Sequence, residues 1–181
     1  MIQLVPVTSS LDLGDDLKQI YFESFPADER REWEDIHQLL YHPPYNLYRI
    51  NVNNELTGLI SIWRWPELIF IEHFALSIPN RELGTGTQVL KQIISENPPT
   101  IILEVELPDT EQAIRRIAFY ERLGFSLCIK DYYQPPYFPG KNKVKMLLMS
   151  FPHSLSPDEF QFYRTKIYKE VYPLYNITDF P

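Results

Sequence analysis

The stretch from Leu76 to Leu90 constrains the fold more than any other part of this chain. The pattern predicts an apolar strand that runs into the stretch and an amphipathic helix that runs out of it, with Gly84 and Gly86 at the turn between them. Backbone N–H groups at the start of a helix have no partner inside the helix, and the helix dipole adds positive potential there. The glycines let a ligand approach the backbone closely, and Arg81 adds a positive charge. This turn therefore suits a phosphate group.

Two common phosphate-binding turns do not match these residues. A P-loop has a lysine directly after its second glycine, and here Thr87 follows Gly86. A dinucleotide-binding turn has a third glycine three residues after the second, and here Val89 occupies that position. What remains is an arginine followed by two glycines one residue apart, and a pattern this short also arises by chance in ordinary strand–helix turns.

Composition restricts the classes of function. The 181 residues suffice for one domain with a sizeable core, and the net charge of −7 argues against nucleic-acid binding while it is compatible with a cationic acceptor. A single cysteine, Cys128, excludes an internal disulfide and a cysteine-based zinc cluster, and we expect no metal site. Because no apolar run approaches the ~20 residues of a membrane span and no secretory signal is evident, we expect a cytoplasmic protein.

Hydrophobic periodicity in the first part of the chain predicts alternating strands and helices. The predicted strands are 2–7, 46–52, 55–65 and 68–76, with a hairpin turn at Asn53-Asn54, and the predicted helices are 12–25 and 28–40. The charged run that opens the second helix is either a solvated helix end or part of a loop over an acceptor site. In the second interpretation, Glu29 or Arg30 turns inward.

The strand 68–76 carries a carboxylate within an apolar pattern. Strict alternation places Glu72 on the same face as Phe70 and Phe74, and places His73 on the opposite face. Carboxylates are rarely buried without a partner or a function. Glu72 is therefore either a structural group or a functional one.

The second part of the chain continues the alternation. After the glycine turn, the pattern predicts a helix that ends at Pro98-Pro99 and a strand at 100–107. The next helix is predicted from Asp109 or Thr110 to Leu123, with Gly124 as its C-terminal cap. Strands at 125–130 and 143–151 follow, and the last predicted helix runs from Ser156 through Val171. The segment 131–140 between the last two strands is rich in tyrosine and proline and is predicted to be a loop.

A second motif lies on the helix that ends near Gly124. Residues 119–125 read Phe-Tyr-Glu-Arg-Leu-Gly-Phe, and they follow the glycine turn by about thirty residues. This pair of motifs, together with the order of elements over residues 1–150, resembles the GNAT superfamily of acetyl-CoA-dependent N-acetyltransferases. The resemblance implies a mixed α/β fold. We expect a mostly antiparallel central sheet of about six to seven strands with a splayed strand pair, flanked by about four helices. Residues 151–181 would form a C-terminal helical extension packed on the same domain.

The resemblance also implies acetyl-CoA as cosubstrate. Its pantetheine arm would enter between the strands 68–76 and 100–107, its pyrophosphate would lie on the glycine turn, and Arg116 could reach its phosphates. Glu82 departs from the family pattern, in which a glycine commonly follows the arginine, and a carboxylate beside a pyrophosphate repels it unless it points outward. The cofactor-binding residues that the resemblance implies are Phe74, Ala75, Leu76, Arg81, Leu83, Gly84, Thr85, Gly86, Thr87 and Arg116.

The reaction needs a neutral amine that attacks the thioester and an acid for the departing thiolate. Tyr120 matches the position at which the family often has a tyrosine that protonates the thiolate. A general base would keep the amine uncharged. Glu72 is the first candidate for this base, Glu104 the second and His73 the third. For Tyr120, the alternative role is that of a core aromatic residue.

The acceptor is expected to be a primary amine of a small molecule, a peptide N-terminus or a lysine. Residues expected to line its pocket are Glu29, Arg30, Glu104, Tyr133 and Tyr137. The alternative function is that of a weak or inactive acyl-CoA-binding sensor of the same fold. The aromatic C-terminal tail is compatible with a homodimer, although it could equally pack on its own sheet.

Overall fold

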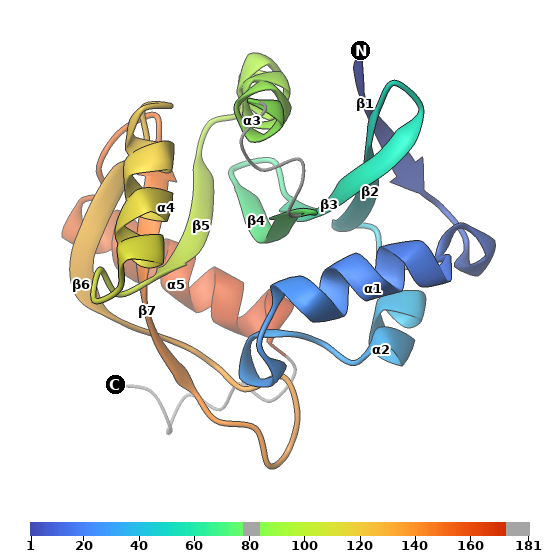
Figure 1. Cartoon of the computed structure of the whole chain (residues 1–181). Helices are drawn as coiled ribbons and strands as arrows, with labels where there is room; N and C mark the ends of the chain where they lie inside the picture. Colours follow the sequence, from blue (N-terminus) through green and yellow to red (C-terminus); the bar gives the residue numbers. More distant parts are fainter. Residues whose placement is uncertain (78–83, 173–181) are drawn as a thin grey trace. The chain divides into compact units, whose positions relative to one another are not determined.

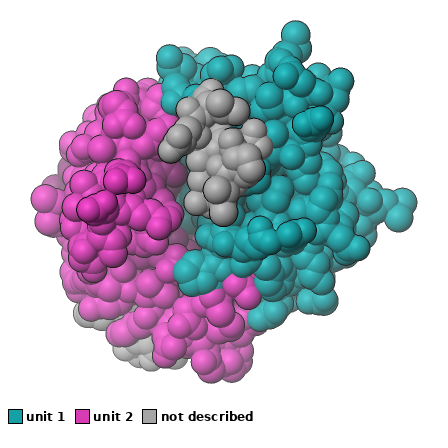
Figure 2. Space-filling model, viewed as in Figure 1, with its two compact units in different colours: residues 1–26, 32–102 teal, residues 27–31, 103–181 magenta. Residues whose placement is uncertain are grey.

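The computed structural model describes residues 1–77 and 84–172, which form seven β-strands and five α-helices (Figure 1). The mixed α/β class and the strand number agree with the sequence prediction. The structure has five α-helices, not four, and the fifth lies in the segment that was predicted to be a C-terminal helical extension. The chain divides into a first unit, residues 1–26 and 32–102, and a second unit, residues 27–31 and 103–181 (Figure 2). Within the described ranges, no helix is long and apolar enough to cross a membrane.

The first unit contains four antiparallel strands in chain order. These are β1 (Ile2–Val7), β2 (Tyr45–Val52), β3 (Glu55–Arg64) and β4 (Ile69–Leu76). The predicted hairpin at Asn53-Asn54 is confirmed, and both asparagines have positive φ, 52° and 70°. Asparagine tolerates this left-handed conformation better than most residues, which is why it is common in tight hairpins.

Three α-helices belong to this unit. They are α1 (Asp15–Ser24), α2 (Trp33–Leu39) and α3 (Thr85–Ser95), and α1 packs on β3 and β4 (Figure 1). The first helix begins three residues later than predicted. The reason is that the Asp12 carboxylate accepts hydrogen bonds from the amides of Thr8 and Ser9, which holds Ser10–Asp12 in a separate 3₁₀ turn.

The prediction that the second helix begins at Asp28 was wrong. Ala27–Glu29 form a 3₁₀ turn, and α2 begins only at Trp33. Contacts distant in sequence explain the difference. The Asp28 carboxylate accepts hydrogen bonds from the amide and side chain of Asn142, at 3.2 and 3.0 Å, and Arg31 donates to the Val171 carbonyl at 2.6 Å. These contacts assign residues 27–31 to the second unit.

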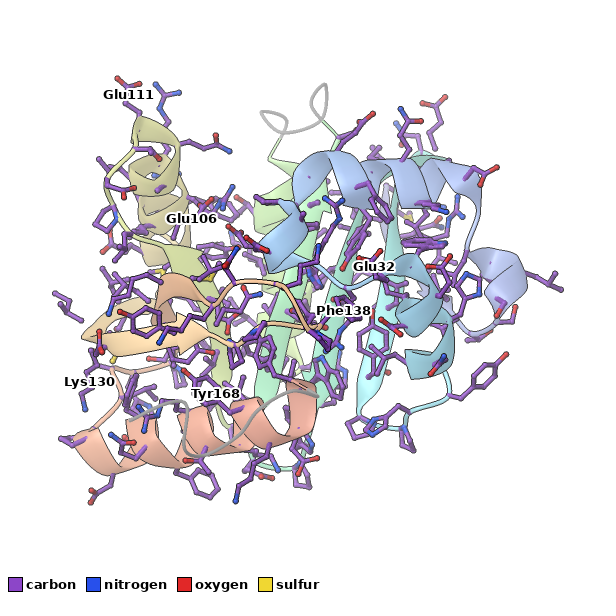
Figure 3. All side chains as sticks on the ribbon, turned by 90° about the horizontal axis from the view of Figure 1, so that it is seen from below. Glu32, Glu106, Glu111, Lys130, Phe138 and Tyr168 are labelled. Atoms are coloured by element: carbon purple, nitrogen blue, oxygen red, sulfur yellow. The ribbon has the colours of Figure 1, made fainter. Side chains whose placement is uncertain are left out.

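The second unit contains most of β5 (Ile101–Glu106), followed by α4 (Glu111–Glu121), β6 (Ser126–Gln134), β7 (Val144–Phe151) and α5 (Pro157–Val171). Its strands lie in the order β5-β7-β6, and α4 and α5 cover opposite faces of them (Figures 1 and 3). Local signals determine the helix starts. The Thr110 hydroxyl accepts from the amide of Ala113, and Ser156 and Glu159 form a reciprocal capping box.

Strand β6 extends four residues beyond its predicted end, so the prediction of a loop over 131–134 was wrong. Tyr132 and Tyr133 lie opposite Met146 and Lys145 on β7 after a bulge in β6. Aromatic residues suit a half-buried strand, and here Tyr132 is 1% exposed while Tyr133 is half-buried. The bulge interrupts the alternation that would have revealed this continuation in the sequence.

Candidate active site

The start of α3 has the features of an anion-binding turn. Gly84 is the N-cap residue with φ of 73°, and no side chain caps the helix. The first intrahelical bond runs from the Gln88 amide to the Gly84 carbonyl, at 3.2 Å. Within the described part of the chain, the amides of Thr85, Gly86 and Thr87 donate to no other group. The first turn carries no acidic residue, so the positive end of the helix is not neutralised there.

Gly84 cannot easily be another residue, because side chains strongly disfavour its positive φ. A Cβ at this position would nevertheless meet nothing within 4 Å, so there is space beside the backbone for a ligand. Arg81 and Leu83, which were also predicted to contact the phosphates, lie outside the described residues, as does Glu82.

The end of β4 is the segment predicted to meet the pantetheine arm. Phe74 is half-buried, while Ala75 and Leu76 are 7% and 8% exposed. These residues pair with β3, where Gly58 lies opposite Leu76. A Cβ on Gly58 would lie 2.3 Å from the Ala75 carbonyl oxygen, so the close approach of the two strands requires glycine. The predicted splay involves strands of different units and stays a prediction.

A β-bulge in β4 changes the position expected for Glu72. Ser61 lies opposite His73, but Ile62 lies opposite Ile71, so Glu72 is the extra residue. Two residues of a bulge face one residue of the partner strand. As a result, the Glu72 carboxylate lies 3.7 Å from His73 Nδ1.

The prediction that Glu72 and His73 occupy opposite faces was therefore wrong. Residues directly opposite each other in a sheet share a face. His73 shares its face with Ser61, and Phe74, opposite Ile60, points to the other side. Strict alternation failed because it assumed an uninterrupted strand.

Glu72 and His73 belong to a buried polar cluster beneath α1. Their side chains are 0% and 2% exposed. Glu72 accepts a hydrogen bond from Trp63 Nε1 at 2.9 Å. His73 Nε2 lies 3.3 Å from the Tyr21 hydroxyl, and His73 Nδ1 lies 3.3 Å from the Ser61 hydroxyl. The cluster contains groups that can bind and release protons. Its members are hydrogen-bond partners for one another, as buried polar groups require.

Tyr120 lies near the end of α4 in the second unit. It is 7% exposed, and its ring packs against Phe119 and Phe125 with centroids 5.1 and 5.6 Å apart. Its hydroxyl hydrogen-bonds to no residue that the structure describes. Burial raises the pKa of Tyr120 to about 12, an effect that Arg116 opposes and Glu106 reinforces. The phenol is therefore protonated at neutral pH and can donate a proton or a hydrogen bond.

Charged groups surround Tyr120. Arg116 of α4 forms an ion pair with Glu106 of β5, which is labelled in Figure 3. Burial raises the pKa of the Glu29 carboxyl, the charge of Glu106 raises it further, and Arg116 lowers it. Arg116 and Glu29 were predicted from the sequence, whereas Glu106 was not, although it lies one alternation after Glu104 on β5. With Arg116 bound to Glu106, its predicted role toward phosphates stays a prediction.

A tyrosine cluster surrounds Glu104. The hydroxyl of Tyr132 donates to Glu104, and the hydroxyl of Tyr172 lies 2.8 Å from each of its carboxylate oxygens. Glu104 was predicted from the sequence, whereas Tyr132 and Tyr172 were not. The sequence signal that could have indicated Tyr172 is its spacing of four residues from Tyr168, which places both tyrosines on one face at the end of the C-terminal helix.

Two predicted wall residues have different surroundings. Tyr137 is 2% exposed and packs against Tyr172, with ring centroids 5.0 Å apart. Tyr133 is half-buried, and the ammonium groups of Lys143 and Lys145 lie 4.8 and 4.3 Å from the centre of its ring. Arg30 is half-buried. Direct contact of these residues with an acceptor stays a prediction.

Comparisons with known proteins agree with this geometry. A family model described as "Acetyltransferase (GNAT) family" matches residues 12–125. The chain is similar to the solved structure of a putative GNAT-family acetyltransferase from Bacteroides thetaiotaomicron, at 32% identity over 97% of this chain and 99% of that one, with a TM-score of 0.86. A search of curated proteins found no match.

More distant solved structures share the fold. A GNAT-family acetyltransferase from Elizabethkingia anophelis, determined with acetyl-CoA bound, is 20% identical over 82% of this chain and 96% of that one, with a TM-score of 0.57. Arabidopsis thaliana Naa50, in complex with the bisubstrate analogue CoA-Ac-MVNAL, is 18% identical over 85% of this chain and 99% of that one, with a TM-score of 0.61.

Proposed function

The chain belongs to the GNAT acetyltransferase family and is an acetyl-CoA-dependent N-acetyltransferase, and on this premise we propose that its acceptor is a primary amine of a small molecule or peptide. The amine would attack the thioester directly. The observation that carries this proposal is Tyr120, a protonated and buried phenol whose hydroxyl bonds to no described residue.

The start of α3 fits the pyrophosphate of acetyl-CoA. Its amides at Thr85, Gly86 and Thr87 have no described partner, and the open side of Gly84 leaves room for an anion. We propose that these three amides hold the phosphates and that the backbone at Phe74–Leu76 pairs with the pantetheine arm. When bound, acetyl-CoA supplies the thioester that the amine attacks.

Tyr120 would act on the leaving sulfur mainly as a hydrogen-bond donor. A thiol ordinarily has a pKa near 8.5, while the pKa of Tyr120 is about 12. Complete proton transfer from this phenol to a thiolate would then be uphill by roughly 5 kcal/mol. A hydrogen bond from the phenol stabilises the negative charge that develops on sulfur and does not require this unfavourable proton transfer.

Glu72 is the proposed general base for the acceptor amine. Because its side chain is completely buried, it would accept the proton through an ordered water or through His73. Glu72→Gln is an informative variant, since the amide oxygen can still accept the hydrogen bond from Trp63. Loss of turnover with unchanged stability supports a base, whereas loss of stability at normal turnover makes Glu72 structural.

The second unit offers a favourable environment for a cationic acceptor. Glu29, Glu104 and Glu106 supply three carboxylates, of which Glu106 forms an ion pair with Arg116. An amine approaches as an ammonium ion at neutral pH, so these carboxylates would attract it. The peptide-based bisubstrate analogue bound by Naa50 supports a peptide amine as one acceptor class.

Calorimetric titration with acetyl-CoA tests the proposal. The wild type should bind, Gly86→Glu should not, and Gln92→Glu should bind normally because Gln92 is exposed near the other end of the same helix. A panel of small amines and peptides is then screened by thiol release. Binding without thiol release for any acceptor would favour a sensor of the same fold, and no binding would contradict the proposal.

A further inference from the structure

The carboxylate of Glu104 receives hydrogen bonds from two buried phenols. Tyr132 donates from β6, and Tyr172 donates from the residue that follows α5, at 2.8 Å from both carboxylate oxygens. Both tyrosines are 1% exposed, while Glu104 is half-buried. The two phenols therefore hold a carboxylate that is not fully buried.

The surroundings hold Tyr172 in place. Its ring packs on Tyr137, whose own ring lies 4.6 Å from the guanidinium carbon of Arg31. Arg31 also donates to the Val171 carbonyl at 2.6 Å. The end of α5 is thus anchored to the 27–31 segment and to the β6–β7 loop, and the position of the Tyr172 hydroxyl is fixed from two sides.

The surroundings of Tyr132 are equally ordered. Its ring lies 5.4 Å from that of Tyr168, which is labelled in Figure 3, and the Tyr168 hydroxyl donates to the Tyr133 carbonyl at 2.5 Å. Burial, and next the negative charge of Glu104, raise the pKa of Tyr132 well above its ordinary value. Tyr132 therefore stays protonated and remains a donor over the whole working range of pH.

We propose that Tyr132 and Tyr172 are positioning residues that hold the Glu104 carboxylate ionised and in one orientation to bind the ammonium group of the acceptor. This inference rests on the proposed function and deepens it, because it makes the C-terminal helix part of acceptor recognition. Phenol-to-carboxylate bonds favour the charged form of the acid and restrict its rotation, and a preoriented carboxylate binds a cation with less loss of entropy.

A structural role for the same contacts makes different predictions. If Glu104 only anchors α5, removal of either hydroxyl lowers stability and leaves the kinetics of the folded enzyme unchanged. If the tyrosines position Glu104, Tyr132→Phe and Tyr172→Phe each raise KM for the acceptor by about tenfold, with a smaller change in kcat and unchanged KM for acetyl-CoA. Tyr163→Phe, on the same helix and 9% exposed, is the matched control and should change neither KM.

A second measurement does not depend on turnover. The ¹³C resonance of the Glu104 carboxylate, assigned through its loss in Glu104→Gln, reports ionisation directly. Among the described residues, the titratable and charged groups near it include the phenols of Tyr132, Tyr137, Tyr168 and Tyr172, together with Arg31 beyond Tyr137. In Tyr172→Phe, the midpoint of this resonance should move upward by about one pH unit.

The two measurements separate the outcomes. An unchanged midpoint in both phenylalanine variants overturns the positioning role, whether or not an acceptor has been found. A shifted midpoint with unchanged acceptor KM overturns the link to acceptor recognition. Wild-type protein that titrates as expected but releases no thiol with any amine contradicts the proposed function alone.

Discussion

Replacement of Tyr120 by phenylalanine should separate catalysis from stability. The ring contacts with Phe119 and Phe125 are retained, and only a hydroxyl without a described partner is lost. Because the hydroxyl makes no bond to a described residue and is not among the fully buried polar atoms without a partner, the free energy of unfolding at pH 8 should change by less than about 1 kcal/mol. Turnover should fall by about 100-fold or more, which is typical of a lost acid or donor.

The pH dependence of the free energy of unfolding gives a second, independent test of the burial of Tyr120. The pKa of Tyr120 is about 12 in the folded state, compared with 10.0 when unperturbed. A raised pKa contributes stability that is fully present below pH 10 and is lost as the pH rises toward 12, because only the unfolded chain ionises there. Two pH units correspond to roughly 3 kcal/mol, and the variant should lack this component of the alkaline loss.

Urea unfolding of wild type and Tyr120→Phe at pH 8 and between pH 10 and 12 measures both effects, and acetyl-CoA titration checks that binding is retained. The difference between the two proteins isolates Tyr120 from the other groups that titrate in this range. Turnover within twofold of wild type would remove Tyr120 from the reaction. Equal alkaline destabilisation of both proteins would refute the argument from burial.

Three further perturbations test other parts of the structure. Gly58→Ala should destabilise the protein by about 1–3 kcal/mol and weaken acetyl-CoA binding, since its Cβ would displace the Ala75 carbonyl; thermal unfolding and calorimetry measure this. Hydrogen bonds from Ser156, first from its backbone, lower the pKa of Glu159 to about 2, so this group contributes stability above pH 4.5 that is lost as the pH falls toward 2. Glu159→Gln should flatten that part of the acid unfolding curve. Burial raises the pKa of Glu29, so its ionisation opposes folding above pH 4.5, and Glu29→Gln should stabilise the protein at pH 7 but not at pH 4, as judged by urea unfolding.

Short-range signals predicted much of the fold correctly. The bounds of β1, the Asn53-Asn54 hairpin and the start of α4 after Thr110 follow from alternation, positive-φ tolerance and helix capping. Gly124, predicted as a C-terminal cap, has φ of 91°. Each of these features depends on a few consecutive residues, so the amino-acid sequence alone is sufficient to predict it.

The wrong predictions share a different origin. The bulge at Glu72 reversed the expected faces because one extra residue shifts every later side chain, and alternation cannot reveal where it occurs. The Asp28 segment left its predicted helix because Asn142 and Val171 bind its polar groups. Both outcomes depend on partners that lie elsewhere in the chain.

The same distinction divides the site. The sequence alone determined the glycine turn and the helix that follows it, because anion binding at a helix start is a local property of the backbone. Tyr120 was selected through the resemblance of residues 119–125 to the family motif. Only the tertiary structure brought Tyr172 to Glu104 across 68 residues and placed Glu72 beside His73. Side-chain chemistry toward an acceptor depends on such distant contacts, and these form only when the strands and helices pack.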